Sequence, residues 1–207
     1  MAGLKIDPMA FRLLQFTLIY TLLLLPWPLA NEAASTYLIA LGHAVYGGPN
    51  DQRELDFEKM ATSDYPYGIR IVIVNRSLMK PDGSGPVRNL DLDARGIVIK
   101  PLALLIALIA VTPLSWLRRL KALGWCLLWE QFIIIAVLGF SIWSEAAEIS
   151  LVHLSPFWLQ VVHSLREVMV SQLGLSVPIL LWLLVVFRRG DERIFKSYLN
   201  FSPAKRT

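Results

Sequence analysis

One acidic side chain lies inside an apolar run of the sequence, where a charge is costly. Glu130 and its neighbour Gln131 fall in the otherwise apolar segment from Trp125 to about Ser144. An ionisable group within hydrocarbon usually serves a function, such as an ion path or a helix contact. Glu130 lies only about 8 Å into this run at 1.5 Å per residue, within reach of headgroups or of the basic residues at 118–121. We predict Glu130 and Gln131 as candidates for a contact with a partner or another helix.

A group of histidines and glutamates follows this run and suggests a second kind of chemistry. His163 and Glu167 are four residues apart, so on a helix they share a face. Such residues can act as acid and base, but the spacing is common and no H-E-x-x-H pattern accompanies it. We therefore interpret them as solvated side chains and expect no metal site. The low-specificity polar cluster consists of Glu145, Glu148, His153, His163 and Glu167.

The single cysteine limits the remaining chemistry. With Cys126 alone, neither an intrachain disulfide nor a cysteine-based metal cluster can form. A thiol–histidine pair is excluded as well, because about 28 Å of helix separates Cys126 from the polar cluster. The sequence contains no phosphate loop, nucleophile elbow or dinucleotide fingerprint. We expect no catalytic residue and no cofactor.

The composition is that of a membrane protein. Hydrophobic residues make up 55% of the chain and charged residues 17%, against roughly 25% charged in soluble domains. The apolar residues form four blocks of about 20 residues, the length that crosses a bilayer as a helix. The first block is followed by Pro26 and Pro28 and resembles a signal peptide, but its cleavage context is poor, which favours a retained anchor. The predicted spans are 11–30, 97–116, 125–144 and 168–187.

The charges orient these spans. Basic residues gather before the first block, between the second and third, and after the fourth, whereas residues 31–99 and 145–167 are net acidic. Cytoplasmic segments are enriched in Lys and Arg. We therefore predict both termini in the cytoplasm, a multi-pass protein of the bacterial inner membrane, and no binding of nucleic acid. Membrane lipid and a membrane protein are the expected partners.

The outside pieces carry the remaining structure. A short helix is expected at 33–46, a clear β-strand at 67–75, and return strands at 87–92 and 95–99. An amphipathic helix is expected in the outer interface from Pro156, running into the fourth span. The predicted fold is thus mainly α, with four transmembrane helices and a small extracytoplasmic β-containing segment. The expected divisions are 1–30, 31–96, 97–187 with an interfacial helix at 156–167, and a basic tail at 188–207.

The stretch RGIVIKPLALLIALIAVTPLSWLRRLKALG, residues 95–124, resembles the small membrane proteins encoded beside bacterial exosortases, of the exosortase H-associated type. The resemblance covers most of the chain in architecture and this stretch in residue pattern. It implies a setting in the bacterial inner membrane and a partner in the machinery that sorts envelope-bound proteins. The family has no catalytic residues to carry over to this chain.

The sequence therefore predicts a non-enzymatic accessory protein that binds or stabilises a partner of an exosortase-type sorting system. The first alternative is an outer-surface membrane enzyme that uses the His and Glu residues of the 145–167 connection. A weaker alternative is a transporter subunit with Glu130 as its ion site.

Overall fold

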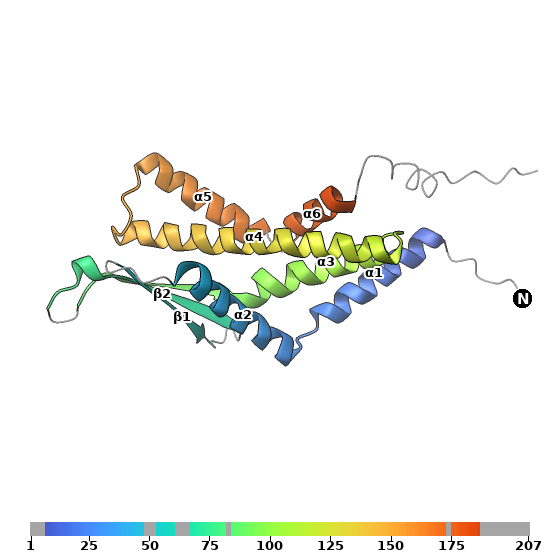
Figure 1. Cartoon of the computed structure of the whole chain (residues 1–207), viewed down its shortest axis with the longest axis horizontal. Coiled ribbons are helices and arrows are strands. Elements are labelled where there is room, and N and C mark those ends of the chain that lie inside the picture. The colour runs from blue at the N-terminus through green and yellow to red at the C-terminus, as the bar shows by residue number, and fades with distance from the viewer. Residues whose placement is uncertain (1–6, 48–52, 61–66, 82–83, 173–174, 187–207) are drawn as a thin grey trace, which may run out of the picture.

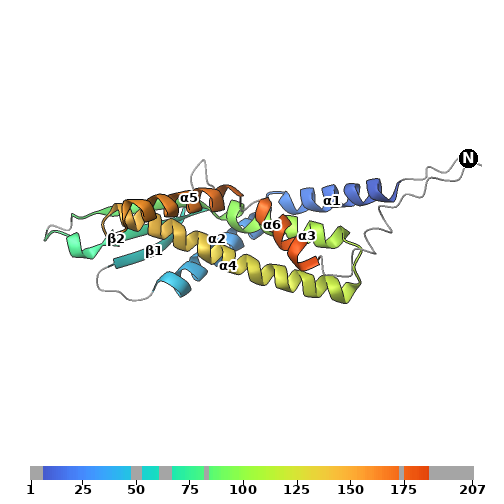
Figure 2. The same cartoon turned by 90° about the horizontal axis from the view of Figure 1, so that it is seen from above.

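The protein is elongated, with one long helix running through most of its length. Figures 1 and 2 show this helix, α4 (Trp116–Glu148), passing from a purely helical end to an end that contains a β-sheet. We call these the helical end and the sheet end. The computed structural model describes residues 7–47, 53–60, 67–81, 84–172 and 175–186. The predicted basic tail, 188–207, lies outside the described residues.

The helical end contains α1 (Pro8–Leu24), α3 (Lys100–Val111), the first half of α4, and α6 (Ser176–Val186). Helix α1 packs on α3, and α6 packs on both α3 and α4. Trp182 in α6 donates a hydrogen bond from Nε1 to the Thr112 hydroxyl at the end of α3, at 3.0 Å. A small apolar core forms where α3, α4 and α6 meet, and its buried members are Leu105, Ile109, Cys126 and Leu181.

Among the described helices, α4 alone is long and apolar enough to cross a membrane. Residues Met9–Leu24 and α2 (Pro28–Tyr46) pass the same test only as a pair, and a 71° bend separates them. This bend divides the predicted span 11–30 at the segment that contains Pro26, since proline removes a backbone donor and clashes with the preceding turn. The described residues thus contain one clear apolar span, and four transmembrane helices are not confirmed.

Helix α4 begins earlier than the sequence indicated. The predicted start was Trp125, but the helix starts at Trp116, after a short turn at 112–115 that contains Pro113. The basic residues at 118–121 therefore lie in the first turns of α4 rather than in a loop. Gly124 is accommodated within the helix, on its exposed side.

The sheet has three antiparallel strands in the order β1-β2-β3. They are β1 (Arg53–Met60), β2 (Gly68–Asn75) and β3 (Val87–Asp93). The strand predicted at 67–75 and the return strand at 87–92 are confirmed, whereas β1 was not predicted. A mainly helical protein with a small sheet is therefore correct as the fold class.

The predicted strand at 95–99 is wrong. Residues Arg95–Ile99 form a π-helical turn that continues into α3. The turn starts directly after β3, where the Asp93 carboxylate accepts a hydrogen bond from the Arg95 backbone N–H at 3.0 Å. Pro101, which fits the first turn of a helix, follows. These local interactions outweigh the β-branched residues of the segment.

One face of the sheet forms the main core of the protein. Ile69, Ile71 and Ile73 alternate along β2 and are fully buried. They belong to one cluster with Leu38 of α2 and Leu138 of α4. Helix α2 was expected at 33–46 and begins earlier, at Pro28. The second half of α4 thus covers the sheet, so that residues of the predicted 97–187 region and the 31–96 region share one core.

Two polar contacts fasten this core to α4. The Tyr46 hydroxyl at the end of α2 donates a hydrogen bond to the Ile135 carbonyl at 2.6 Å. At the other end, the Asn75 side chain donates to the Ile149 carbonyl at 3.1 Å. Because both partners are backbone carbonyls, the contacts fix the position of the sheet along the helix.

Helix α5 (Pro156–Gln172) returns from the far end of α4 and packs along its second half (Figure 1). The sequence predicted an amphipathic helix that continues into a span at 168–187. The structure instead has two helices: α5 ends at Gln172 and α6 starts at Ser176, with a change of direction between them. The predicted end of that span, Phe187, lies outside the described residues.

A cross-strand ion pair lies on the open face of the sheet and predicts a pH effect. The Arg70 guanidinium donates to Asp91 at 2.8 Å, and this hydrogen bond holds the pKa of Asp91 below its ordinary value. The pair therefore stabilises the fold above the ordinary Asp pKa of about 4, and its contribution is lost as the pH falls through the lowered value. We expect Asp91→Asn to reduce stability slightly near neutral pH and to have no effect in strong acid, as measured by denaturant unfolding. An equal loss at every pH would contradict this.

Candidate functional site

Glu130 is the most unusual polar residue in the helical end. It lies on the buried stripe of α4, one turn after Cys126 and one turn before Ile134. Its residue surface is 2% exposed, and neither carboxyl oxygen has a hydrogen-bond partner within the part of the chain that the structure describes. The expected reach to headgroups or to the basic residues at 118–121 is therefore not realised. Because α4 starts at Trp116, Glu130 lies about 21 Å along the helix at 1.5 Å per residue.

A second polar site joins α4 to α5 at the sheet end. Ser144, which is fully buried, contacts His163 through Oγ and Nδ1 at 2.9 Å. The Arg166 guanidinium donates to the Glu145 carboxylate at 2.7 Å and to Ser144 Oγ at 3.5 Å. The side chains of Glu145 and Arg166 are 13% and 28% exposed. We call Ser144, Glu145, His163 and Arg166 the α4–α5 clasp.

Arg166 fixes the direction of the hydrogen bonds that it makes in the clasp. Arginine can only donate, so Ser144 Oγ accepts from Arg166. The Ser144 hydroxyl and His163 Nδ1 share the other hydrogen bond, in which either group can donate, depending on the tautomer of the imidazole. A serine beside a histidine resembles a nucleophile and its base. Here, however, the hydroxyl is buried beneath α5, and the Glu145 carboxylate is held by Arg166. The geometry therefore suits a tie between two helices better than catalysis.

The other members of the predicted polar cluster do not join this site. Glu148 forms an ion pair with Arg88 of β3. His153 and Glu167 are exposed, His153 in the connection beyond α4 and Glu167 on α5. Among the described residues, no three or more His, Cys, Asp and Glu side chains are placed to hold a metal ion. The predicted cluster is thus divided among separate places on the sheet end.

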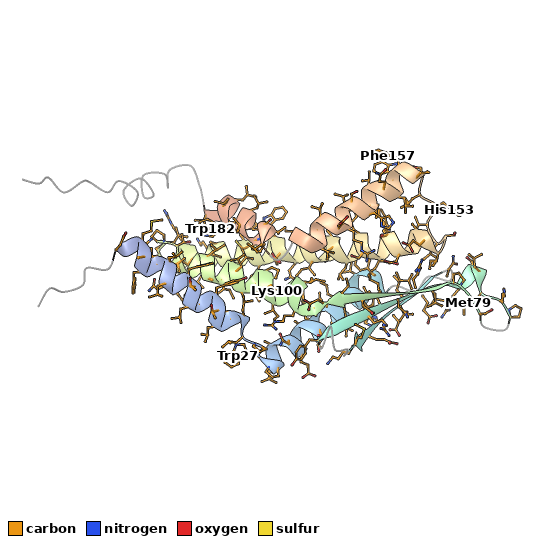
Figure 3. All side chains as sticks on the ribbon, turned by 180° about the vertical axis from the view of Figure 1, so that it is seen from behind. Trp27, Met79, Lys100, His153, Phe157 and Trp182 are labelled. Carbon is orange, nitrogen blue, oxygen red and sulfur yellow. The ribbon has the colours of Figure 1, made fainter. Side chains whose placement is uncertain are left out.

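Helix α5 turns His163 and Arg166 towards α4 and part of its apolar face outward. Val162 is buried, whereas five large apolar side chains of α5 are more than a third exposed, Val170 among them. Figure 3 shows Phe157 at the far end of the molecule, near His153 and away from Trp182 of the helical end. The ring centroids of Phe157 and Trp158 lie 5.6 Å apart in an edge-to-face pair. Four of the five share one side of the helix, and we call them the α5 stripe: Phe157, Trp158, Leu165 and Val168.

The clasp predicts a stability effect. Arg166→Ala removes the cation from Glu145, which stays largely buried, and a charge left unpaired in this way costs about 3–5 kcal/mol when fully buried. Because Arg166 is partly exposed, we expect a smaller loss, about 2 kcal/mol. Amide hydrogen exchange along α5 should rise while exchange in β2 stays unchanged. Arg76→Ala, which breaks an exposed pair with Glu54, is the matched control and should leave α5 unaffected.

No family model, curated protein or solved structure matches this chain. A function for the protein must therefore be inferred from the arrangement of its residues. Sequence reasoning missed Ser144 and Arg166, which complete the clasp. The one sequence feature that pointed to Arg166 is that it follows His163 by three residues, on the same face of a helix.

Proposed function

We propose that the protein is a non-enzymatic accessory subunit of a bacterial inner membrane, with its helical end in the bilayer and its sheet end holding a partner protein outside. The α5 stripe carries this proposal. Burial of such a stripe is favourable at about 25 cal/mol per Å² of apolar surface, and contiguous exposed apolar surface commonly marks an interaction site. The partner is a protein rather than lipid, because Phe157 lies at the end of the molecule opposite the helical bundle.

The helix lengths support a multi-pass arrangement of the helical end. Helix α1 has 17 residues, and the π-turn and α3 form a continuous helical segment of the same length. At 1.5 Å per residue each is about 25 Å long, near the lower limit for a span. Many large apolar side chains of this end are exposed, as expected for contact with lipid. They include Leu13, Leu14, Leu18, Trp125, Trp129, Phe132 and Leu184.

The length of α4 supports a sheet end outside the membrane. Its 33 residues extend about 50 Å at 1.5 Å per residue, whereas the hydrocarbon core is about 30 Å thick. With the basic residues at 118–121 at the cytoplasmic boundary, the last third of α4 extends beyond the outer surface. The sheet, α2 and α5 pack on the second half of α4, which includes that part. A continuous helix thus holds the α5 stripe at a fixed height above the bilayer.

This topology predicts the accessibility of introduced cysteines. Met79→Cys, in the exposed connection after β2, should react with a membrane-impermeant maleimide in intact spheroplasts. Lys121→Cys, exposed near the start of α4, should react only after the membrane is permeabilised. The native Cys126 is buried, so the wild-type chain serves as the background control. Labelling of both positions in intact cells would contradict the proposal.

The partner that we propose is a component of an exosortase-type sorting system, on the basis of the resemblance of residues 95–124. Co-expression with the exosortase-type peptidase of the same genome, followed by purification in mild detergent, tests this. We expect the two proteins to co-purify at a fixed ratio. Recovery of the chain alone, as a stable monomer, would overturn the proposal. An unrelated multi-pass protein expressed at the same level is the control for adhesion in the detergent.

A further inference from the structure

The buried carboxyl group of Glu130 has no assigned role in a subunit that binds partners through its sheet end. It lies at the edge of the apolar core formed by α3, α4 and α6. A carboxylate that is buried without a hydrogen bond or an ion pair costs several kcal/mol. A buried carboxylate therefore needs a group that neutralises its charge. Three such groups are considered: a metal cation, a basic side chain and a proton.

The surroundings argue against the first two groups. Hard cations bind to several oxygen ligands at once. The buried polar side chains described at this junction besides Glu130 are Cys126 and Thr112, and the Thr112 hydroxyl already donates to the Leu108 carbonyl and accepts from Trp182. A basic side chain of a partner would need access, but Glu130 is 2% exposed. A proton needs neither further oxygens nor an opening of the width of a side chain.

The charged groups on the described helices of the junction have other partners or lie far from Glu130. The ionisable residues of α3 and of the π-turn before it are Lys100, which pairs with Asp93 at 3.8 Å, and Arg95, which donates to the Leu24 carbonyl. Helix α6 has none over Ser176–Val186. In α4 the nearest are Cys126, one turn away, and the basic residues at 118–121, more than two turns away. The described part of the junction thus offers no counter-charge.

We infer that Glu130 is a proton-binding site inside the helical bundle, and that release of the proton weakens the packing of α4 against α3 and α6. With the proton bound, the carboxyl is neutral and fits an apolar junction. With the proton released, the carboxylate must take up water or move towards a cation, and either change opens the junction. The inference is independent of the proposed partner.

A hydrophobic carbodiimide tests the proton directly. Dicyclohexylcarbodiimide adds across the O–H of a carboxylic acid and rearranges to a stable N-acylurea, with no leaving group, so that only the protonated form reacts. We expect mass spectrometry of the full chain, treated in proteoliposomes, to find the adduct at Glu130. The adduct should fall by about tenfold per pH unit once the carboxyl ionises. Glu148, exposed and paired with Arg88, is the internal control and should stay unmodified near neutral pH.

Glu130→Gln separates a proton site from a merely structural residue, because the amide has the shape of the protonated acid and cannot ionise. We expect this variant to fold, to lose the adduct, and to show a melting temperature that no longer falls as the pH is raised from about 4, the ordinary Glu value, to the pH at which the folded carboxyl ionises. The wild-type chain should lose stability over the same range. Absence of an adduct at Glu130 in the folded wild-type chain, or the same pH profile in both proteins, would overturn the inference. Either result leaves the partner experiment unaffected.

Discussion

Replacing Gly42 by valine should detach α2 from the sheet. A Cβ atom at Gly42 would lie 2.6 Å from Cδ1 and 2.8 Å from Cζ of the Phe57 ring. The ring cannot move aside easily, because Phe57 is 4% exposed and belongs to the main core. Overpacking of a filled core costs about 1–3 kcal/mol, and the branched valine adds two further methyl groups. We expect a loss at or above the upper end of that range, seen as faster amide exchange in β1 and β2.

Gly124→Ala is the matched control for this substitution. It lies in α4 with no atom within 4 Å of the position of its Cβ. Alanine is favoured over glycine in a helix by about 1 kcal/mol, so this variant should be neutral or slightly more stable. If Gly42→Val were as stable as Gly124→Ala, the close packing of α2 on β1 would be wrong, and with it the position of α2 over the sheet.

The strands show what the sequence could and could not predict. Strand β2 reads GIRIVIVN, in which β-branched residues alternate between a buried and a more exposed face, and this pattern predicts a strand directly. Strand β1 reads RELDFEKM, and five of its eight residues are charged. Only Leu55 and Phe57 show the alternation. Because β1 is an edge strand, its charged side chains meet water and also discourage pairing with other chains, so that its composition resembles that of a loop.

The helices were harder to delimit than to detect. Basic residues after an apolar block were interpreted as a loop, but at 118–121 they lie within the first turns of α4. Long basic side chains can extend towards water from a helix end, so they do not require a break. The sequence pattern also could not predict which face of α5 packs on α4, because both faces carry residues that are able to pack. Its orientation is decided by Ser144 and Glu145 of α4, which are far from α5 in sequence.

One of the two candidate sites could be predicted from the sequence and the other could not. Glu130 was predicted as a candidate site because an acidic residue inside an apolar run can be recognised without any tertiary information. The clasp was not predicted as a site, because it depends on which faces of α4 and α5 meet. Of the five residues in the predicted polar cluster, Glu145 and His163 enter the clasp, and the spacing that linked His163 to Glu167 has no counterpart in a contact.

Replacing Phe157 and Trp158 together by serine should abolish partner binding without unfolding the protein. Both side chains are more than half exposed and form part of the α5 stripe, so their removal leaves no cavity in the core. In an interface, buried aromatic residues of this kind commonly contribute 2 kcal/mol or more each on truncation, and about 1.4 kcal/mol corresponds to a factor of ten in affinity. We therefore expect about a 100-fold or greater loss in affinity for the co-expressed peptidase, measured by titration in detergent.

The control for this variant lies on the same end of the molecule. Leu78 and Met79 are also apolar and exposed, in the short helical turn and connection after β2. Their replacement by serine removes a similar amount of apolar surface outside the stripe and should leave affinity unchanged. If both double variants weakened binding equally, the contact would depend on general hydrophobicity. If neither did, α5 would not be the binding surface, and the open face of the sheet would be the next to test. Loss in the α5 variant alone, at unchanged thermal stability, is the result that assigns the partner to the α5 stripe, and the clasp then holds this helix against α4 in the position that binds.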